Sequence, residues 1–280
     1  MREFATKVPV ANRDHLVDTC GTGGDSIGSF NISTTSALVA AAAGARVAKH
    51  GGRSVSSTCG SADVLERLGV NLNLTPEQVG LCVDNVGIGF MFAPNFHGAM
   101  KYAAPVRREL GVRTMFNVLG PLTNPAGAEN QILGVFHPDL VGIMARVLQR
   151  LGSRHVLVVN GMDGMDEISI SSGTHVAELK GGEVDEYIIS PEQFGLSISS
   201  NDLLRVANVD EACDMLQGVL DDRRGAPRDI VTLNAGAAIY VSGLSGTLAE
   251  GVAKADQIIA SGKAKSILEK LIQFSRKFQA

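Results

Sequence analysis

Apolar and polar positions along the chain form blocks that predict strands followed by helices. The apolar run at 15–20 predicts a short strand, and the alanine-rich run at 33–43 predicts a helix that starts at hydroxyl residues and ends at Gly44. A second strand at 46–49 and a second helix at 61–68 follow. Strands that alternate with helices indicate an α/β fold with a mostly parallel central sheet flanked by helices.

The same pattern continues to the C-terminus, with one exception in the middle. Further strands are predicted at 131–136, 155–159, 174–179 and 184–188, and further helices at 140–151, 210–220, 229–241 and 247–261. The middle block has two predicted helices, at 76–86 and 98–110, on either side of a short apolar strand at 88–92. A loop rich in Pro, Asn and Gly follows at 117–127. We therefore expect an α/β domain formed by residues 1–75 and 129–280, and a helical-domain segment with a hinge at 76–128.

Composition narrows the class of protein. Glycine makes up 32 of the 280 residues, above the globular average of about 7%, which predicts tight backbone turns of the kind that ligand sites use. The net charge of −4 argues against a nucleic-acid partner, and the chain has neither a membrane-spanning run nor a signal peptide. The four cysteines are scattered, without metal spacing or disulfide density, so we expect a cytoplasmic protein.

A glycine loop follows the first predicted strand. Gly21, Gly23 and Gly24 leave room for backbone N–H groups to converge, and the next helix directs its positive end toward the same point. This pattern predicts a phosphate or pyrophosphate site, although it matches neither the P-loop nor the full dinucleotide fingerprint. The alternative, a turn that only caps a helix, has about equal weight for the glycines alone. Nearby polar residues favour the anion site: Asp25, Asn31, Ser33 and Thr34.

Two further polar loops follow predicted strands. In the first, KHGGRSVSS at 49–57, Lys49 and Arg53 can neutralise phosphates, although a solvated surface loop is the usual fate of such a pair. In the second, NGMDGMDEISIS at 160–171, Asp166 and Glu167 are the hard oxygen ligands that Mg²⁺ prefers. Two acidic residues alone favour a solvated turn, but a polyphosphate site beside them favours a metal site. Neither a Ser-His-Asp set nor a partnered Cys nucleophile is evident, so covalent catalysis is not indicated.

Several long motifs in order resemble the anthranilate phosphoribosyltransferase family. They are GTGGD with FNIST, KHGGRSVSS with GSADVLE, PVRRELGVRTMFNVLGPLTNP, GMDGMDEIS and VSGLSGTLAEG, and together they cover nearly the whole chain. The resemblance implies a small helical domain joined to a large α/β domain. It also implies transfer of phosphoribose from 5-phosphoribosyl 1-pyrophosphate to the amine of anthranilate, with release of pyrophosphate, and a homodimer.

The resemblance assigns roles to residues of this chain. It implies substrate contacts from Gly21, Gly24, Asp25, Ser29, Asn31, Ile32, Ser33, Thr34, Lys49, His50, Gly51, Gly52, Arg53, Ser54, Val55, Ser56, Ser57 and Ser61. It implies that Ser33, Asp166 and Glu167 contact Mg²⁺ and that Lys49 and the acidic pair act in catalysis. Arg107 would contact the anthranilate carboxylate, with His50, Pro94 and His97 along its channel.

The chain departs from the family pattern at several places. Gly52 stands where the family has an Asn that positions anthranilate, Ser29 replaces a Thr, and Gly98 replaces a Pro. The family also has helices before the position of Met1, so we expect uncovered apolar surfaces at 79–86 and 99–110, reduced activity and an altered oligomeric state. Two alternatives stay open: a non-catalytic relative that binds phosphoribosyl pyrophosphate, and, less favoured, an enzyme similar to the pyrimidine nucleoside phosphorylases.

Overall fold

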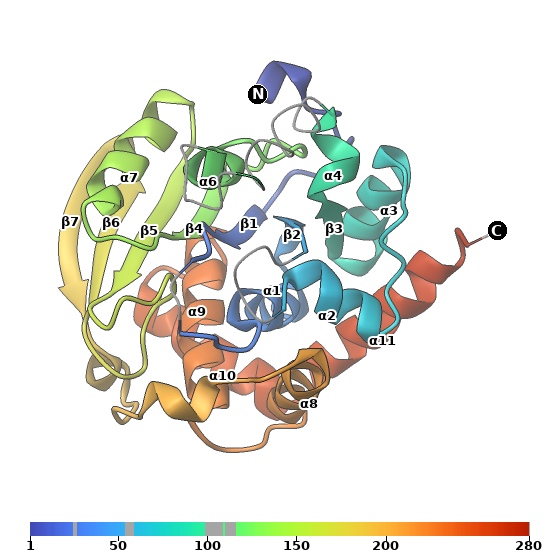
Figure 1. Ribbon diagram of the computed structural model, residues 1–280. Helices are drawn as coiled ribbons and strands as arrows, with labels where there is room; N and C mark the ends of the chain where they lie inside the picture. Colours follow the sequence, from blue (N-terminus) through green and yellow to red (C-terminus); the bar gives the residue numbers. More distant parts are fainter. Residues whose placement is uncertain (25–26, 54–58, 99–108, 110–115, 280) are drawn as a thin grey trace.

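The computed structural model describes residues 1–24, 27–53, 59–98, 109 and 116–279. The described strands form one seven-stranded sheet in the order β3-β2-β1-β4-β5-β6-β7 (Figure 1). The strands are β1 (Leu16–Gly21), β2 (Arg46–Gly51), β3 (Ile88–Phe92), β4 (Asn130–Gly134), β5 (His155–Gly161), β6 (Thr174–Lys180) and β7 (Glu183–Ile189). In that order, the five strands from β3 to β5 pair in parallel. Strand β6 pairs antiparallel with both of its neighbours, β5 and β7. The predicted mostly parallel sheet is confirmed.

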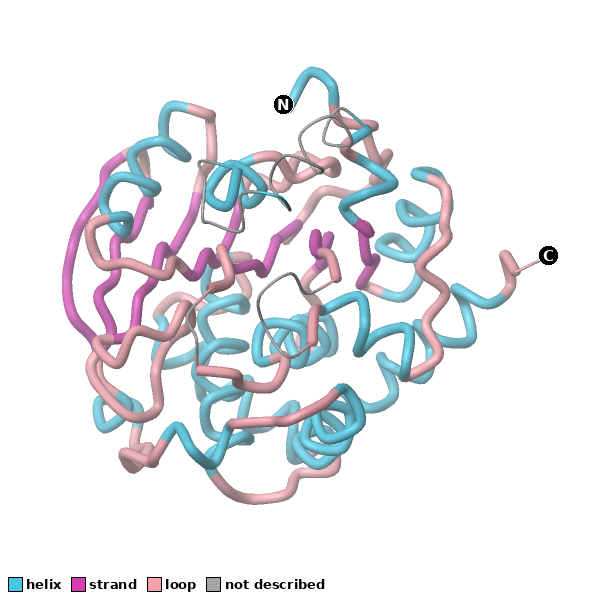
Figure 2. Tube along the Cα trace, in the orientation of Figure 1, coloured by secondary structure: helices cyan, strands magenta, loops and turns pink. Residues whose placement is uncertain are grey.

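Helices lie on both sides of this sheet (Figure 2). The longer ones are α1 (Ile32–Ala42), α2 (Ser61–Arg67), α3 (Pro76–Val86), α7 (Leu140–Arg150), α8 (Val209–Leu220), α9 (Ala226–Val241), α10 (Leu248–Ala260) and α11 (Lys263–Arg276). Short helices are η1 (Arg2–Phe4), α4 (Ala93–Phe96), α6 (Phe116–Leu119), η3 (Gly120–Leu122), η4 (Pro191–Phe194) and η5 (Asn201–Leu204). The predicted strands and helices are present within a few residues of their expected ends, except that α11 was not predicted and the helix expected at 98–110 lies largely outside the described residues.

Two hydrophobic layers hold the sheet. Along β5, Val156 and Val158 pack in a cluster with α7, whereas Leu157 and Val159 pack in the larger cluster on the opposite face. This alternation is the two-residue period of a strand that is buried on both faces. Helices α1 and α9 supply the second face. Because both faces are covered, the exposed ends of the strands are where loops can present polar groups.

Helix α3 is covered within this chain. Val79 and Val83 are fully buried, and α3 packs against β3 and α11. A side chain at Gly80 would overlap the carbonyl of Pro9, so the N-terminal segment also lies directly on this helix. The expectation of an uncovered surface at 79–86 is therefore wrong, because α11 and the N-terminal segment were not recognised as its partners. The other surface, at 99–110, lies outside the described residues, apart from Glu109.

Strand β3 lies within the segment 76–128, which was expected to be separate from the α/β domain. It pairs in parallel with β2 from Val47↔Ile88 to Gly51↔Phe92 and so belongs to the central sheet. The helical-domain segment at 76–128 stays a prediction, and its first part, 76–92, contributes a helix and an edge strand to the α/β layer.

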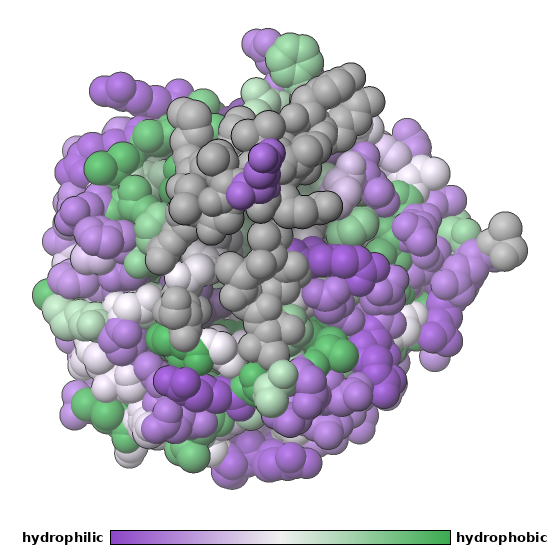
Figure 3. Space-filling model, in the orientation of Figure 1, coloured by the Kyte–Doolittle hydropathy of each residue, from purple (hydrophilic) through white to green (hydrophobic). Residues whose placement is uncertain are grey.

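The face of the molecule shown in Figure 3 is mostly hydrophilic among its described residues. Hydrophobic residues on the face shown in Figure 3 form small separate groups among hydrophilic ones. Among the helices that the structure describes, none combines the length and hydropathy required to span a bilayer.

Candidate active site

Three of the predicted loops start at the same edge of the sheet. The glycine loop follows β1 and the acidic loop 162–167 follows β5, whereas the predicted loop at 49–57 starts within β2, which includes Lys49, His50 and Gly51. These strands are parallel, so their carboxyl ends lie together. In open α/β sheets this edge is where ligands bind.

The glycine loop and the acidic loop are in direct contact. The backbone N–H of Gly23 donates to Oδ2 of Asp166 at 2.7 Å. Gly23 and Gly24 have φ of 68° and 86°, a left-handed conformation that glycine adopts without strain. The glycine loop and the acidic loop, which the sequence predicts to lie beside each other, are thus in contact in the fold.

Two strand-end glycines make this contact possible. Gly21 on β1 pairs with Gly134 on β4. A Cβ at Gly21 would lie 2.5 Å from Oδ2 of Asp166, and a Cβ at Gly134 would overlap the backbone carbonyl of Asp166. The acidic loop therefore lies directly on the ends of β1 and β4. Sequence reasoning missed Gly134, since it placed this residue inside an ordinary strand.

Lys49 is buried beneath the start of α1. Its Nζ donates to the Thr19 carbonyl at 2.5 Å and to Ser33 Oγ at 3.1 Å. The N-cap of α1 is Asn31, which makes no capping side-chain bond. The hydroxyl of Ser33, which was predicted to contact substrate and Mg²⁺, accepts this bond from Lys49 beside the N-terminus of the helix. This arrangement places positive charge where an anion would approach.

Asp18 is the nearby counter-charge for Lys49. It is 1% exposed, and burial raises the pKa of its carboxyl to about 6 despite hydrogen bonds and the attraction of Lys49. Burial likewise lowers the pKa of Lys49, and the Asp18 carboxylate opposes that shift. The two buried groups therefore attract each other electrostatically.

A histidine pair lies next to this region. Nε2 of His50 is 3.0 Å from Nε2 of His97, and the rings meet edge to face. Burial, followed by the proximity of His97 and Lys49, lowers the pKa of His50 to about 3. Burial also lowers the pKa of His97. Both rings are therefore neutral at pH 7, with one nitrogen donating and the other accepting.

The second loop is partly tied to α2. Arg53 forms ion pairs with Asp63 and Glu66, both at 2.8 Å, and its guanidinium lies over the Phe92 ring. A Cβ at Gly51 would overlap Ser61 Oγ, so Ser61 approaches the loop backbone closely. In contrast, no described atom lies within 4 Å of a Cβ at Gly52.

The remaining expected residues divide into three groups. Ile32 and Thr34 have buried side chains, so their side chains cannot reach a ligand without rearrangement. Ser29 lies in a short bridge to Arg205, and Pro94 is exposed in α4, three residues before His97. Asp25, Ser54, Val55, Ser56, Ser57 and Arg107 lie outside the described residues.

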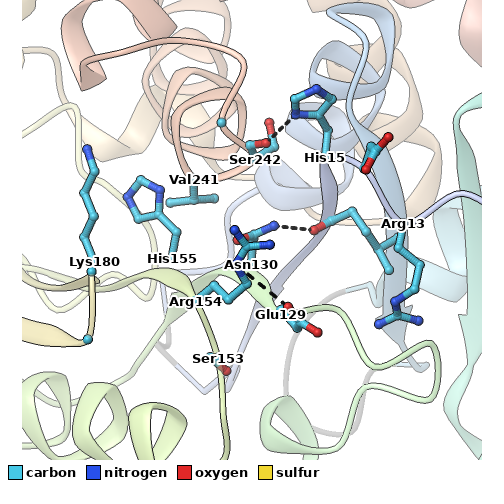
Figure 4. A pocket seen from close by; sticks show the side chains of 15 residues that line it. Arg13, His15, Glu129, Asn130, Ser153, Arg154, His155, Lys180, Val241 and Ser242 are labelled. Atoms are coloured by element: carbon cyan, nitrogen blue, oxygen red, sulfur yellow. Dashed lines mark hydrogen bonds and ion pairs between the residues drawn. The ribbon is translucent and has the colours of Figure 1, made fainter.

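A separate cavity lies at the opposite edge of the sheet. It has a volume of about 910 Å³ and is lined by the amino ends of β1, β4 and β5, at Leu16, Asn130 and His155 (Figure 4). The cationic side chains of Arg13 and Lys180 lie on opposite sides of it (Figure 4), and Arg13 donates to two backbone carbonyls. This cavity does not share residues with the loops described above.

The chain belongs to a glycosyl transferase family, whose α/β domain corresponds to the fold described above. The family model described as "Glycosyl transferase family, a/b domain" matches residues 13–265. Within that class, the chain belongs to the anthranilate phosphoribosyltransferases. It is 66% identical over 275 residues to the anthranilate phosphoribosyltransferase of Thiobacillus denitrificans, covering 98% of this chain and 80% of the relative. The relative from Chromobacterium violaceum is 63% identical over 99% of this chain and 81% of its own length.

Solved structures agree with this assignment. The crystal structure of anthranilate phosphoribosyltransferase from Thermus thermophilus matches with a TM-score of 0.93 at 46% identity, covering 99% of this chain and 82% of that chain. The Saccharomyces cerevisiae enzyme in complex with PRPP (5-phosphoribosyl 1-pyrophosphate) and Mg matches with a TM-score of 0.89 at 28% identity, over 99% of this chain and 77% of that one.

Proposed function

We propose that the carboxyl edge of the sheet binds 5-phosphoribosyl 1-pyrophosphate together with Mg²⁺, between the glycine loop and the acidic loop. As an anthranilate phosphoribosyltransferase, the chain transfers the phosphoribosyl group to the amine of anthranilate and releases pyrophosphate. The observation that carries the proposed site is the hydrogen bond from Gly23 to Asp166, which brings an anion-binding backbone and a carboxylate together.

The residues present fit a magnesium ion. Asp166 and Glu167 are adjacent, partly exposed carboxylates on a loop held over Gly21 and Gly134. Ser33 Oγ, the third proposed contact, is oriented by its bond from Lys49. Mg²⁺ needs only one or two protein carboxylates, because water and substrate phosphates supply its other ligands. When bound, the ion would neutralise charge on the pyrophosphate.

Residues of the chain then favour departure of the pyrophosphate. The amine nitrogen of anthranilate forms a bond to C1 of the ribose, and the C1–O bond breaks with its electron pair moving to pyrophosphate. Lys49, the N–H groups of the glycine loop and the positive end of α1 stabilise that growing negative charge. The amine is a neutral nucleophile, so its proton can leave to water after attack.

The anthranilate side of the site is assigned to the histidine pair. His50 and His97 are neutral and buried, so they offer flat uncharged faces against which the aromatic ring of anthranilate can pack. We assign Pro94 and Arg107 to the same channel from the family motif. Gly52 provides no amide side chain here, which predicts weaker anthranilate binding than in relatives with Asn at this position.

Three wider expectations stay with this proposal. We propose that the segment 76–128 forms part of a helical domain and contains a hinge. We also propose a location in the cytoplasm. The family resemblance implies a homodimer, and the altered oligomeric state expected for this chain stays a prediction.

The test is anthranilate consumption followed by fluorescence, with and without Mg²⁺, for the parent chain and Asp166→Ala. We expect Mg²⁺-dependent consumption, reduced at least about 100-fold by the substitution. Asp185→Ala is a matched control, since Asp185 is an exposed acid on β7, away from the site. Binding of 5-phosphoribosyl 1-pyrophosphate without turnover would indicate a non-catalytic relative. Phosphorolysis of thymidine without Mg²⁺ would indicate a nucleoside phosphorylase.

A further inference from the structure

Asp163 lies in the acidic loop but makes contacts away from the proposed metal ligands. Its Oδ1 accepts from the backbone N–H of Met165 at 3.0 Å. Its Oδ2 accepts from the hydroxyls of Ser169 and Ser171, both at 2.5 Å, and from Nδ2 of Asn201 at 2.8 Å. A local turn would need only the bond to Met165. Two of the donors on Oδ2, Ser169 and Ser171, lie six and eight residues further along the same loop, and the third, Asn201, lies 38 residues away.

These bonds fix one side of the acidic pair. Gly161 donates its N–H to the carbonyl of Met165 at 2.8 Å, and the Met165 side chain is fully buried. The bond from the Met165 N–H to Asp163 completes this turn immediately before Asp166. The residue just before Asp166 is therefore held in place by hydrogen bonds at both its N–H and its carbonyl.

Asn234 of α9 fixes the other side of the pair. Its Oδ1 accepts from the N–H of Ile168 at 2.9 Å, and its Nδ2 donates to the carbonyl of Ile168 at 2.9 Å. Asp166 and Glu167 are thus bracketed by two anchored residues. The anchor at Met165 is local, whereas the anchor at Ile168 depends on Asn234, 66 residues away, and no local pattern predicts it.

Asn201 connects this loop to the far end of the glycine loop. It starts η5, and the carbonyl of Leu204 at the end of η5 accepts from the N–H of Phe30 at 3.0 Å. Val206 donates its N–H to the carbonyl of Gly28 at 3.0 Å. The segment at 28–30 leads directly into α1 and Ser33. One chain of bonds therefore joins Asp163 to the segment that carries Ser33, and the bond from Gly23 to Asp166 closes the near side.

We propose that Asp163 is a positioning residue that holds the acidic pair in register with the glycine loop for a divalent cation and a diphosphate. This inference rests on the proposed roles of Asp166 and Glu167. Asp163 acts through the backbone of its own loop and through Asn201, and does not itself touch the ion. Groups that orient metal ligands in this way typically change metal affinity about 10- to 100-fold when substituted.

The experiment measures binding of Mn²⁺ with pyrophosphate by electron paramagnetic resonance, so that no turnover is required. We expect Asp163→Asn to weaken binding about 10- to 100-fold, because an amide N–H then faces the Asn201 amide. Asn201→Asp is expected to weaken it similarly, because two carboxylates then face each other. The double variant restores one amide facing one carboxylate at this contact, so binding should recover in part, while the Ser169 hydroxyl, which already accepts from two backbone N–H groups, still faces an amide. The KM for anthranilate should change less than about two-fold in each variant.

The matched control is Asp84→Asn. Asp84 also accepts two backbone N–H bonds, from Ala11 and Asn12, but on α3 and away from the acidic loop. Its substitution should leave Mn²⁺ binding unchanged. If Asp163→Asn fails to fold, Ser171→Ala removes a single donor to the same carboxylate and should weaken binding several-fold.

The outcomes separate this inference from the proposed function. If Asp166→Ala abolishes Mn²⁺ binding but Asp163→Asn, or Ser171→Ala in its place, binds like the parent, the positioning role is wrong and the metal site stands. Absence of recovery in the double variant also overturns the role of the pair with Asn201. If Asp166→Ala and Glu167→Ala themselves bind Mn²⁺ and pyrophosphate like the parent, the proposed metal site is wrong.

Discussion

The backbone of Asp166 lies directly on Gly134, the last residue of β4, with no room for a side chain between them. We expect Gly134→Ala to displace the acidic loop, lower activity at least about 100-fold and destabilise the fold by about 1–3 kcal/mol. Turnover assays and urea unfolding measure the two effects. The control is Gly120→Ala, where no described atom lies within 4 Å of the added Cβ. Equal behaviour of the two variants would contradict the close approach.

The histidine pair predicts a particular dependence of stability on pH. The folded-state pKa of His50 is lowered to about 3, whereas the unfolded value is about 6.5. Between these values the unfolded chain binds a proton that the folded chain does not, so this group's contribution to stability falls as pH falls from about 6.5 toward 3. The loss is at most about 1.4 kcal/mol per pH unit.

This prediction is checked by urea unfolding of the parent and His50→Gln at several values between pH 7 and 4.5. The free energy of unfolding should fall more steeply with decreasing pH for the parent than for the variant. Parallel curves would show that His50 is not held neutral.

Gly52 offers space for the amide that the family motif has at this position. A Cβ added there meets no described atom within 4 Å. We expect Gly52→Asn to lower the KM for anthranilate about five-fold, the effect of one added hydrogen bond of about 1 kcal/mol. The KM for phosphoribosyl pyrophosphate should change less than two-fold. Gly52→Ala adds the Cβ without the amide, and an equal gain in that variant would argue against a hydrogen bond.

Glu178 should matter for stability and not for catalysis. Its carboxylate accepts from the Tyr187 and Tyr240 hydroxyls, both at 2.7 Å, and from His155 at 3.0 Å. Burial opposes ionisation, but these hydrogen bonds prevail and lower the pKa of Glu178 to about 2. The stabilisation is present above the unfolded pKa and is lost as pH falls through about 2.

Glu178→Gln tests this separation of roles. We expect a loss of about 2 kcal/mol in the free energy of unfolding at pH 7. The value of kcat should stay within about two-fold, since Glu178 is on β6 near the edge opposite the acidic loop. A large fall in kcat without a change in stability would reverse this assignment.

Local sequence signals predicted most of the fold. Helix α1 follows from its alanine run, and the strands follow from their apolar blocks. Helix α11 was missed because its start has Gly262, with φ of 71°, and no capping side-chain bond. A hydroxyl or carboxylate cap is the usual signal of a helix start.

The candidate site was predictable only as far as its loops. Lys49, Asp166 and Glu167 stand out because they follow strands in polar, glycine-rich runs. The roles of Gly134 and Asn234 arise from contacts with the acidic loop that span 32 and 66 residues of sequence. No local pattern encodes such contacts, because they form only when the strands and α9 have packed together.

The backbone amide of Gly23 lies at the contact between the glycine loop and the acidic loop. Its proton is hydrogen-bonded to Oδ2 of Asp166. Deuterium uptake at that single position therefore reads how often the two loops separate in the resting protein. Slow uptake would mean that the two loops are already ordered against each other in the folded protein. The entropy lost in ordering them would then be part of folding and would not weaken the binding of a diphosphate.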